Sequence, residues 1–143
     1  MVRFGKATDY ALLALMYLVE RQEQVASARQ IAQALHLPAP LLGKILKSLH
    51  QNGLLQSTRG VKGGYRIAVD LRDISFESLL RMLRVELSPT DRPTDAPLWA
   101  FQSKLTQALR EVKLSDLVIP GRRIDVPVDA IRIRRNPSPA LVQ

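Results

Sequence analysis

Apolar residues recur at helical spacing in five segments of this chain and alternate with polar residues in two short runs between them. The first segment, Tyr10–Val19, is apolar nearly all round, which is typical of a central helix covered on several sides. Its ten residues are about half of what a membrane span requires. The pattern therefore predicts a buried helix near the start of the chain.

Two further helices are expected around a tight turn. Ser27 begins the sequence SARQIAQAL with Gln30 three positions later, a capping box in which each side chain bonds the other's backbone N–H. The prolines of HLPAP end this helix, and Pro40 suits the first turn of the next one, over residues 40–52. Gly53 can take the left-handed conformation that closes it. The inner apolar positions of this helix are Leu42, Ile45, Leu46 and Leu49.

Two strand candidates, residues 54–58 and 65–69, flank a loop that contains Gly60, Gly63 and Gly64. The pattern predicts a β-hairpin whose glycines make the tip narrow and whose Arg59 and Lys62 make it positive. A phosphate-cradling loop is a rival interpretation, but such loops precede a helix, and here the next segment is strand-like. A purely structural hairpin is the other alternative, and it does not explain the basic-faced helix directly before it.

The rest of the chain predicts two helices, a linker and a tail. Helical spacing resumes after Ser75, which can cap a fourth helix, at Phe76, Leu79, Leu80, Leu83 and Leu87. Residues 88–97 hold three prolines and no apolar face, as expected of a linker loop. Over 98–112 the apolar positions fall three or four apart, as in a helix that pairs with another helix. The proline-rich, basic segment 120–143 is expected to be a largely disordered tail.

Composition narrows the class of protein. Lys and Arg number 21 against 13 Asp and Glu, and this net charge of +8 favours a polyanionic partner. The excess lies in residues 1–70 and in the tail. There is no cysteine, which excludes disulfides, a thiol nucleophile and any Cys-ligated zinc or iron–sulfur site. No secretory signal pattern is found, so a soluble cytoplasmic protein with one main domain is expected.

These elements together predict a winged helix-turn-helix domain, in a mainly α fold with a small β-hairpin (α+β). A helix can read the major groove of DNA only if its outer face offers donors. A hairpin must be narrow and positive to reach phosphates or the minor groove. Lys44 and Lys47 share one side of the third helix with Ser48 and Gln51, so this side is expected to contact DNA.

Catalytic chemistry finds no support in the motifs. His36 and His50 are the two histidines, and neither has a carboxylate or cysteine at the spacing of a ligand or a triad. Neither a carboxylate pair nor an activated nucleophile can be assembled from the sequence. We therefore do not expect an enzyme.

Four segments carry a resemblance to a known family. They are DYALLALMYLV, SARQIAQALHLPAPLLGKILKSLHQNGLL, STRGVKGGYRI and LWAFQSKLTQALREVKLSDLV. Over residues 3–118 the chain resembles the Rrf-two family of bacterial winged-helix regulators, the IscR, NsrR and CymR type. The resemblance implies a homodimeric transcription factor, most often a repressor, on a palindromic operator in double-stranded DNA. The long C-terminal helices of such proteins pair across the two-fold axis.

The resemblance also shows what this chain lacks. Members that sense iron or nitric oxide carry three cysteines between the fourth helix and the tryptophan that begins the dimerisation helix, here Trp99. This stretch offers only Glu86, Asp91 and Asp95 as ligands, and Ala96 stands where cluster-binding members often carry histidine. We therefore expect no iron–sulfur cluster and no metal. DNA binding is then either constitutive or controlled by an unidentified small organic effector held between the domains near Trp99.

Two sets of site residues follow from the pattern and the resemblance together. The expected DNA-binding set is Arg3, Lys6, Thr8, Tyr10, Ser27, Arg29, Pro40, Gly43, Lys44, Lys47, Ser48, Gln51, Arg59, Gly60, Lys62 and Gly63. The expected dimer interface is Leu98, Trp99, Phe101, Leu105, Leu109 and Val112. Gly43 stands where related recognition helices frequently carry glutamate, so the operator sequence of a relative does not transfer to this chain.

The expected domain order places DNA binding before dimerisation. The DNA-binding domain is expected over 1–87, with the helix-turn-helix at about 27–52 and the wing at 54–69. A linker follows over 88–97, at the position of the family's cluster-binding loop. The dimerisation helix region is then expected over 98–119 and the tail over 120–143. The alternative function is a winged-helix protein-interaction module that has lost operator recognition and docks through the helix at 98–112.

Overall fold

The computed structural model describes residues 4–85 and 96–119, with side chains from residue 100 onward in the second range. Their elements are α1 (Lys6–Val19), α2 (Ala28–Leu35), α3 (Ala39–Gln51), β1 (Leu55–Thr58), β2 (Gly64–Ile67), the 3₁₀ helix η1 (Leu71–Asp73), α4 (Phe76–Met82), α5 (Ala96–Glu111) and α6 (Leu114–Leu117). This is the expected mainly helical fold with one hairpin. The expectations for Leu87, most of the linker and the tail lie outside the described residues.

Three helix ends differ from the sequence pattern by more than one residue. α1 begins at Lys6, four residues before the apolar run, directly after Gly5, whose φ is positive at 86°. α4 ends at Met82, because Arg84 with φ 56° turns the chain before the apolar spacing runs out. α5 already includes Pro97, which had been expected in the linker. Proline is tolerated in a first helical turn, where its missing N–H has no intrahelical partner.

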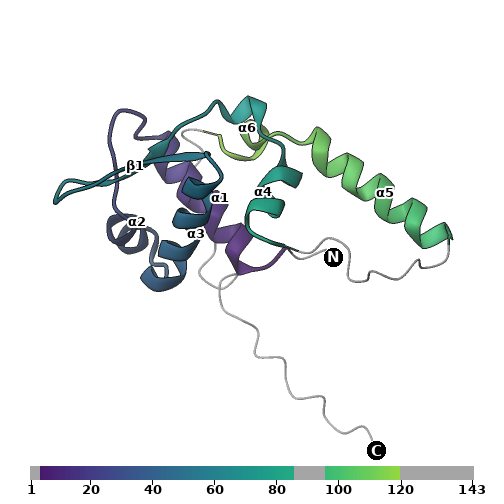
Figure 1. The fold of residues 1–143 in the computed structure, drawn as a ribbon, viewed down its shortest axis with the longest axis horizontal. Coiled ribbons are helices and arrows are strands. Elements are labelled where there is room, and N and C mark those ends of the chain that lie inside the picture. Colours follow the sequence, from purple (N-terminus) through teal and green to yellow (C-terminus); the bar gives the residue numbers. More distant parts are fainter. Residues whose placement is uncertain (1–3, 86–95, 120–143) are drawn as a thin grey trace, which may run out of the picture.

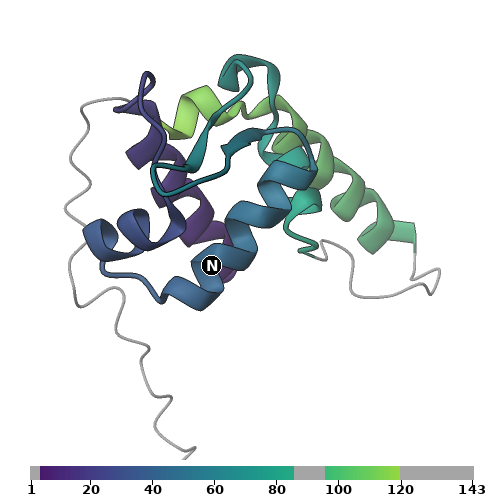
Figure 2. The same cartoon turned by 60° about the vertical axis from the view of Figure 1, so that its left-hand side comes forward.

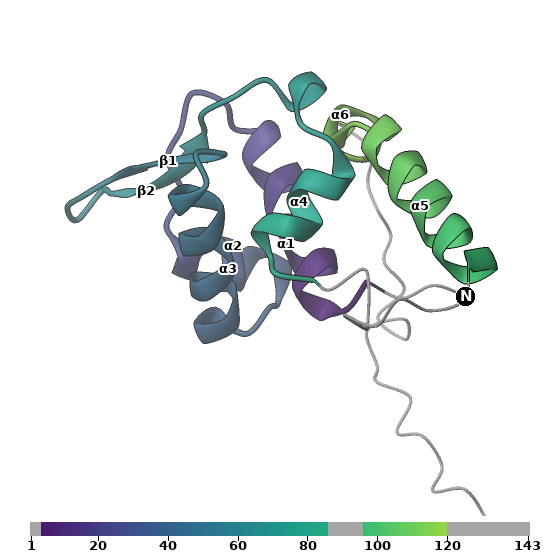
Figure 3. The ribbon, with the colours of Figure 1, turned by 45° about the vertical axis from the view of Figure 1, so that its right-hand side comes forward.

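The core lies between α1, α3 and α4, and α1 is its central member (Figure 3). Each helix turns its spaced leucines inward, and the fully buried ones are Leu15, Leu18, Leu42, Leu46, Leu49, Leu79 and Leu80. Burying one such side chain stabilises the fold by roughly 1.5–3 kcal/mol. α1 thereby packs against both helices of the helix-turn-helix and against β2.

The hairpin projects from the body as an antiparallel pair beside α2 and α3 (Figure 1). Its register pairs Leu55 with Ile67 at the base and Thr58 with Gly64 toward the tip. Leu54 and Leu55 are buried, whereas the three remaining residues of β1 are exposed. The base of the wing therefore belongs to the core and its outer part stands free.

α5 lies on the opposite side of the molecule from the hairpin (Figures 1 and 3). It packs against α4, and the turn after it returns to the body. There the N–H of Phe76 donates to the carbonyl of Val112 at 2.8 Å, and that of Leu114 donates to the carbonyl of Ile74 at 2.8 Å. These bonds anchor the end of α5. None of the described helices combines the length and apolarity needed to cross a bilayer.

Candidate nucleic-acid interface

The outer face of α3 is built as the sequence pattern predicts. Leu42, Ile45, Leu46 and Leu49 are buried, and the opposite side of the same helix is left to solvent. The exposed residues of α3 include Pro40, Lys44, Lys47 and Gln51. A helix with one buried side and two exposed ammonium groups on the other has the donors that base edges and phosphates accept.

Local hydrogen bonds fix both the start of α2 and the turn between α2 and α3. Ser27 and Gln30 form the expected capping box, with N–H to oxygen distances of 3.1 and 2.9 Å. His36 ends α2 in a left-handed conformation with φ 55°. Leu37, buried in the core, donates its N–H to the carbonyl of Ala32 at 2.9 Å. Figure 2 shows α2 and α3 side by side with the turn at their ends. α3 is therefore presented at a defined angle.

The tip of the wing is a tight turn closed by a hydrogen bond from the N–H of Gly63 to the carbonyl of Gly60 at 2.9 Å. Gly60 has φ 115°, which favours glycine. A side chain at Gly63 would lie 2.2 Å from the carbonyl oxygen of Thr58, so only glycine fits there. Arg59 and Lys62 are both exposed at this tip, as predicted.

Gly64 has a different role from the one expected of it. A Cβ at this position would lie 2.3 Å from the carbonyl carbon of Ala26, so the absence of a side chain lets two backbones meet. Ala26 and Tyr65 then exchange two hydrogen bonds of 3.0 and 2.8 Å. This glycine does not narrow the tip. It lets the wing attach to the segment that leads into α2.

His50 ties α3 to the wing. Its Nδ1 lies 3.0 Å from the carbonyl oxygen of Leu55, and its Nε2 lies 3.3 Å from Oγ of Ser57. The ring also meets Tyr65 edge-on, with 6.2 Å between centroids. Both ring nitrogens therefore have partners within the chain, so His50 connects the end of the helix to the first strand of the hairpin.

Three residues of the expected DNA-binding set turn inward, and their role in DNA binding stays a prediction. Thr8 is 1% exposed and donates its hydroxyl to the carbonyl of Phe4 at 2.9 Å. Tyr10 is 8% exposed and belongs to the core. Ser48 is half-buried and donates to the carbonyl of Met82 at 2.7 Å, because α4 covers that side of α3. Helical spacing alone could not show this covering.

The other members of the set divide by exposure. Lys6, Arg29 and Gly60 are exposed along with the residues of α3 and the wing named above. Ser27, Gly43 and Gly63 are half-buried, and Arg3 lies outside the described residues. The structure thus brings the exposed basic groups of α3 and the wing onto neighbouring elements, since α3 packs directly against β1.

Two exposed residues of the wing were missed in the sequence. Val61 is fully exposed at the tip beside Lys62. Its position between glycines in the loop was the sequence signal that could have predicted this exposure. Arg66 is exposed on β2 and donates to Oε1 of Gln56 on the facing strand at 2.8 and 3.0 Å. The antiparallel register places Arg66 opposite Gln56. Predicting this pair from the sequence would have required the exact strand boundaries.

The expected dimer stripe on α5 is covered in part by the chain itself. Leu109 is only 9% exposed and Val112 packs against the core. Leu105 is half-buried, whereas Phe101 is 63% exposed. The side chains of Leu98 and Trp99 lie outside the described part. Leu109 and Val112 therefore hold α5 to its own body, whereas Phe101 presents a large apolar surface outward. The dimer interface as a whole stays a prediction.

A buried carboxylate joins α4 to α5. Glu77 on α4, with its side chain 10% exposed, accepts a hydrogen bond from Arg81 one turn later. Its other oxygen lies 4.0 Å from Nε of Arg110 on α5. Because both guanidinium groups are largely exposed, this cluster adds a modest electrostatic contact to the packing of Leu109.

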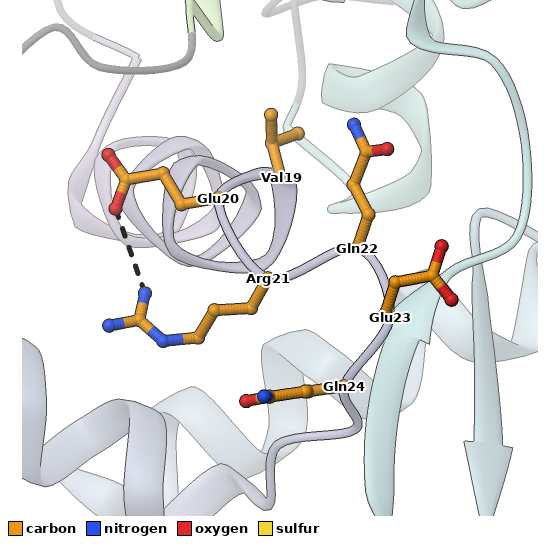
Figure 4. A pocket seen from close by; sticks show the side chains of 6 residues that line it. All are labelled: Val19, Glu20, Arg21, Gln22, Glu23 and Gln24. Carbon is orange, nitrogen blue, oxygen red and sulfur yellow. Dashed lines mark ion pairs between the residues drawn. The ribbon is translucent and has the colours of Figure 1, made fainter.

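Sites for small ligands and metals are poorly developed in the described ranges. A hollow at the end of α1 is lined by six consecutive residues, Val19 to Gln24, with an ion pair of 3.6 Å between Glu20 and Arg21 (Figure 4). No second element lines it, so it does not enclose a ligand. Within residues 4–85 and 96–119 no three His, Cys, Asp or Glu side chains come together as metal ligands.

The amino-acid sequence is similar to those of known transcriptional regulators. A sequence profile of the Rrf2 family, described as iron-dependent transcriptional regulator, matches residues 4–119. An HTH-type transcriptional regulator of Synechocystis is 31% identical over 127 residues, which cover 80% of this chain and 86% of that protein. CymR of Bacillus subtilis is 28% identical over 115 residues, which cover 76% of this chain and 83% of CymR.

Solved structures of the same kind share the fold. The structure of CymR, the global cysteine regulator of B. subtilis, superposes with a TM-score of 0.67 at 26% identity, covering 82% of this chain and 97% of CymR. IscR of T. potens superposes with a TM-score of 0.64 at 25% identity, covering 82% of this chain and 86% of IscR. Both superpositions cover about four fifths of this chain.

Proposed function

We propose that this chain, which belongs to the Rrf2 family of transcriptional regulators, is a homodimeric repressor that binds a palindromic operator. DNA binding and regulation, rather than catalysis, are the activities of this family. The finer points, namely repression, the two-fold operator and the dimer, are our proposal. As a regulator of transcription, the protein would act in the cytoplasm, where bacterial DNA is found.

One observation carries the proposal: the exposed basic groups lie where a winged helix meets DNA. Lys44 and Lys47 stand on the free side of α3, and Arg59 and Lys62 stand at the wing tip. A helix in the major groove and a hairpin reaching the adjacent phosphates or minor groove would use these groups together. The side of the molecule with α5 lies away from them, which leaves α5 free for a second copy.

The dimer proposal depends on the outward side of α5. Phe101 is 63% exposed on a helix that stands at the edge of the body, and an aromatic side chain of this size is a typical anchor of an interface. A two-fold dimer through α5 would place two wings and two α3 helices on one duplex. Successive half-sites would then be read by identical surfaces, which is why a palindromic operator is expected.

Control by iron does not fit the residues present. The chain has no cysteine, so it cannot form a thiolate-ligated cluster. Of its two histidines, His50 is bonded to Leu55 and Ser57, and His36 closes α2. The proposal is therefore a cluster-free regulator, either constitutive or controlled by an organic effector. Purified protein should be colourless, and a chelator should leave its operator affinity unchanged.

The test is a binding experiment on the DNA upstream of the protein's own gene, compared with unrelated duplex at two salt concentrations. A specific regulator should prefer one sequence and lose affinity steeply as salt rises, because bound phosphates release counterions. Binding to both duplexes alike would contradict the operator. No binding even at low salt would instead support the alternative, a winged-helix module that contacts proteins through α5.

A further inference from the structure

Gly43 occupies an unusual place in α3. It lies in the interior of a helix of thirteen residues, at a half-buried position next to the exposed Lys44 and one turn before Lys47. Glycine in a helix interior is less favourable than alanine by roughly 0.5–1 kcal/mol, since it loses more conformational freedom on folding. A glycine at such a position requires a reason.

The fold itself supplies no reason. A Cβ built on Gly43 meets no atom within 4 Å, so no neighbouring element needs the space. Its backbone is ordinary right-handed helix and is not among the glycines with positive φ. This contrasts with Gly63 and Gly64, where an added Cβ would lie 2.2 and 2.3 Å from backbone atoms. The space beside Gly43 is open to the outside of the protein.

We infer that Gly43 marks the point where α3 comes closest to DNA, with its bare Cα against the edge of a base pair in the major groove. The inference rests on the proposed function and adds the residue that sets the depth of the helix in the groove. Lys44 and Lys47 supply the charge beside it, so the partner at this point is a nucleic acid. A glycine cannot bond a phosphate through a side chain, but its flat apolar surface suits close contact with a base edge, such as a thymine methyl group.

This inference predicts that stability and affinity change in opposite directions. Gly43→Ala should raise the melting temperature by about 2–4 °C, since alanine favours the helix and meets no obstacle in the fold. The same methyl group should lower affinity for the operator about tenfold, as one mismatched base pair would. Affinity for unrelated duplex should stay unchanged, because that affinity comes from phosphate contacts.

A larger side chain sharpens the test. Gly43→Leu should bind the operator still more weakly than Gly43→Ala while remaining folded. Ser103→Leu is the matched control, since it adds a leucine at an exposed helical position on α5. That control should leave operator affinity within about twofold of the original, as expected for a surface change away from the DNA.

The outcomes separate this inference from the proposed function. If the unaltered protein binds its operator and Gly43→Ala binds it equally well, the close approach at Gly43 is wrong and the proposed function stands. A lowered melting temperature in Gly43→Ala would also overturn the inference, because the glycine would then serve the fold. If the unaltered protein shows no sequence preference, the proposed function fails first. A more stable variant with a selective loss of operator affinity supports both.

Discussion

The wing and α5 are the two parts that project from the body, and they are attached in different ways. Backbone hydrogen bonds between Ala26 and Tyr65 and the side-chain bonds of His50 fix the wing to its neighbours. α5 is held through Leu109, the buried Glu77 and the backbone bonds that follow it. One projection is thus fixed along its base, and the other at its C-terminal end, with the exposed Phe101 nearer its start.

This difference fits the two tasks proposed for these parts. A wing that is to deliver Arg59 and Lys62 to DNA must be held at a defined distance from α3, and several bonds within the chain do this. A helix that is to meet a second copy would complete its packing only in the proposed dimer, which would account for the apolar surface that it leaves open. The substitutions below test this comparison, beginning with the largest expected effect.

The body that carries both projections should be the most sensitive part. Leu46 on α3 is completely buried, so Leu46→Ala should lower the free energy of unfolding by about 2–5 kcal/mol through lost burial and a residual cavity. Urea unfolding followed by circular dichroism measures this. Gln51→Ala, exposed on the same helix, is the control and should change it by less than about 0.5 kcal/mol. Similar losses in both variants would contradict the packing of α3.

The outward side of α5 should affect assembly and leave the fold intact. Phe101→Asp places a charge where an aromatic anchor is proposed, and the dimer should weaken by at least about 2 kcal/mol, or roughly 30-fold. Because Phe101 is 63% exposed in one chain, the stability of the monomer should change little. Sedimentation equilibrium measures the association, with Ser103→Asp as the control. An unchanged dimer in the Phe101 variant would place the interface elsewhere.

The wing and α3 should affect DNA binding without affecting the dimer. Arg59→Ala should weaken operator binding by about 1–3 kcal/mol if the guanidinium enters a groove. Lys44→Ala and Lys47→Ala should each lower the salt slope by about one if their ammonium groups touch phosphates. The control is Lys104→Ala, which removes the same positive charge from an exposed position on α5. Unchanged affinity with Arg59, Lys44 and Lys47 all replaced would rule out this DNA surface.

The attachment of α5 should depend modestly on its buried carboxylate. Glu77→Gln removes the charge that faces Arg81 and Arg110, and should cost about 0.5–1 kcal/mol after allowance for the exposure of both arginines. Hydrogen exchange is the sharper measurement. Amides of α5 should exchange faster while those of α3 keep their protection. Glu111→Gln, exposed at the end of α5, should change neither.

The smallest effect concerns the turn between the wing and α4. Hydrogen bonds from the side chain and backbone of Arg72 lower the pKa of Asp70 from 3.8 to about 2. A lowered pKa in the folded state stabilises the protein above pH 3.8, and this contribution is lost as the pH falls through about 2. Asp70→Asn should therefore melt slightly lower at pH 6, and the difference should shrink toward pH 2. A difference that grows at low pH would contradict the ion pair.

Much of the fold was predictable because its signals are local. The capping box of Ser27 and Gln30 and the spaced leucines of α3 depend on residues within a turn or two of each other. The basic outer side of α3 and the glycine-closed tip of the wing followed from the same short-range patterns. The exposure of Lys44, Lys47, Arg59 and Lys62 was predicted correctly for this reason.

What the tertiary structure alone decided involves partners far apart in the sequence. Helical spacing identifies the apolar side of α5, but it does not say whether the chain's own core or a second molecule covers a given position, so Leu109 and Phe101 looked alike. Helical spacing places Ser48 on the outer side of α3, but α4 covers it. The loop pattern places Gly64 at the tip of the wing, but its backbone lies against Ala26. Local sequence determines which surfaces an element has. Which of them are buried depends on how distant elements pack, because burial is a property of the assembled core.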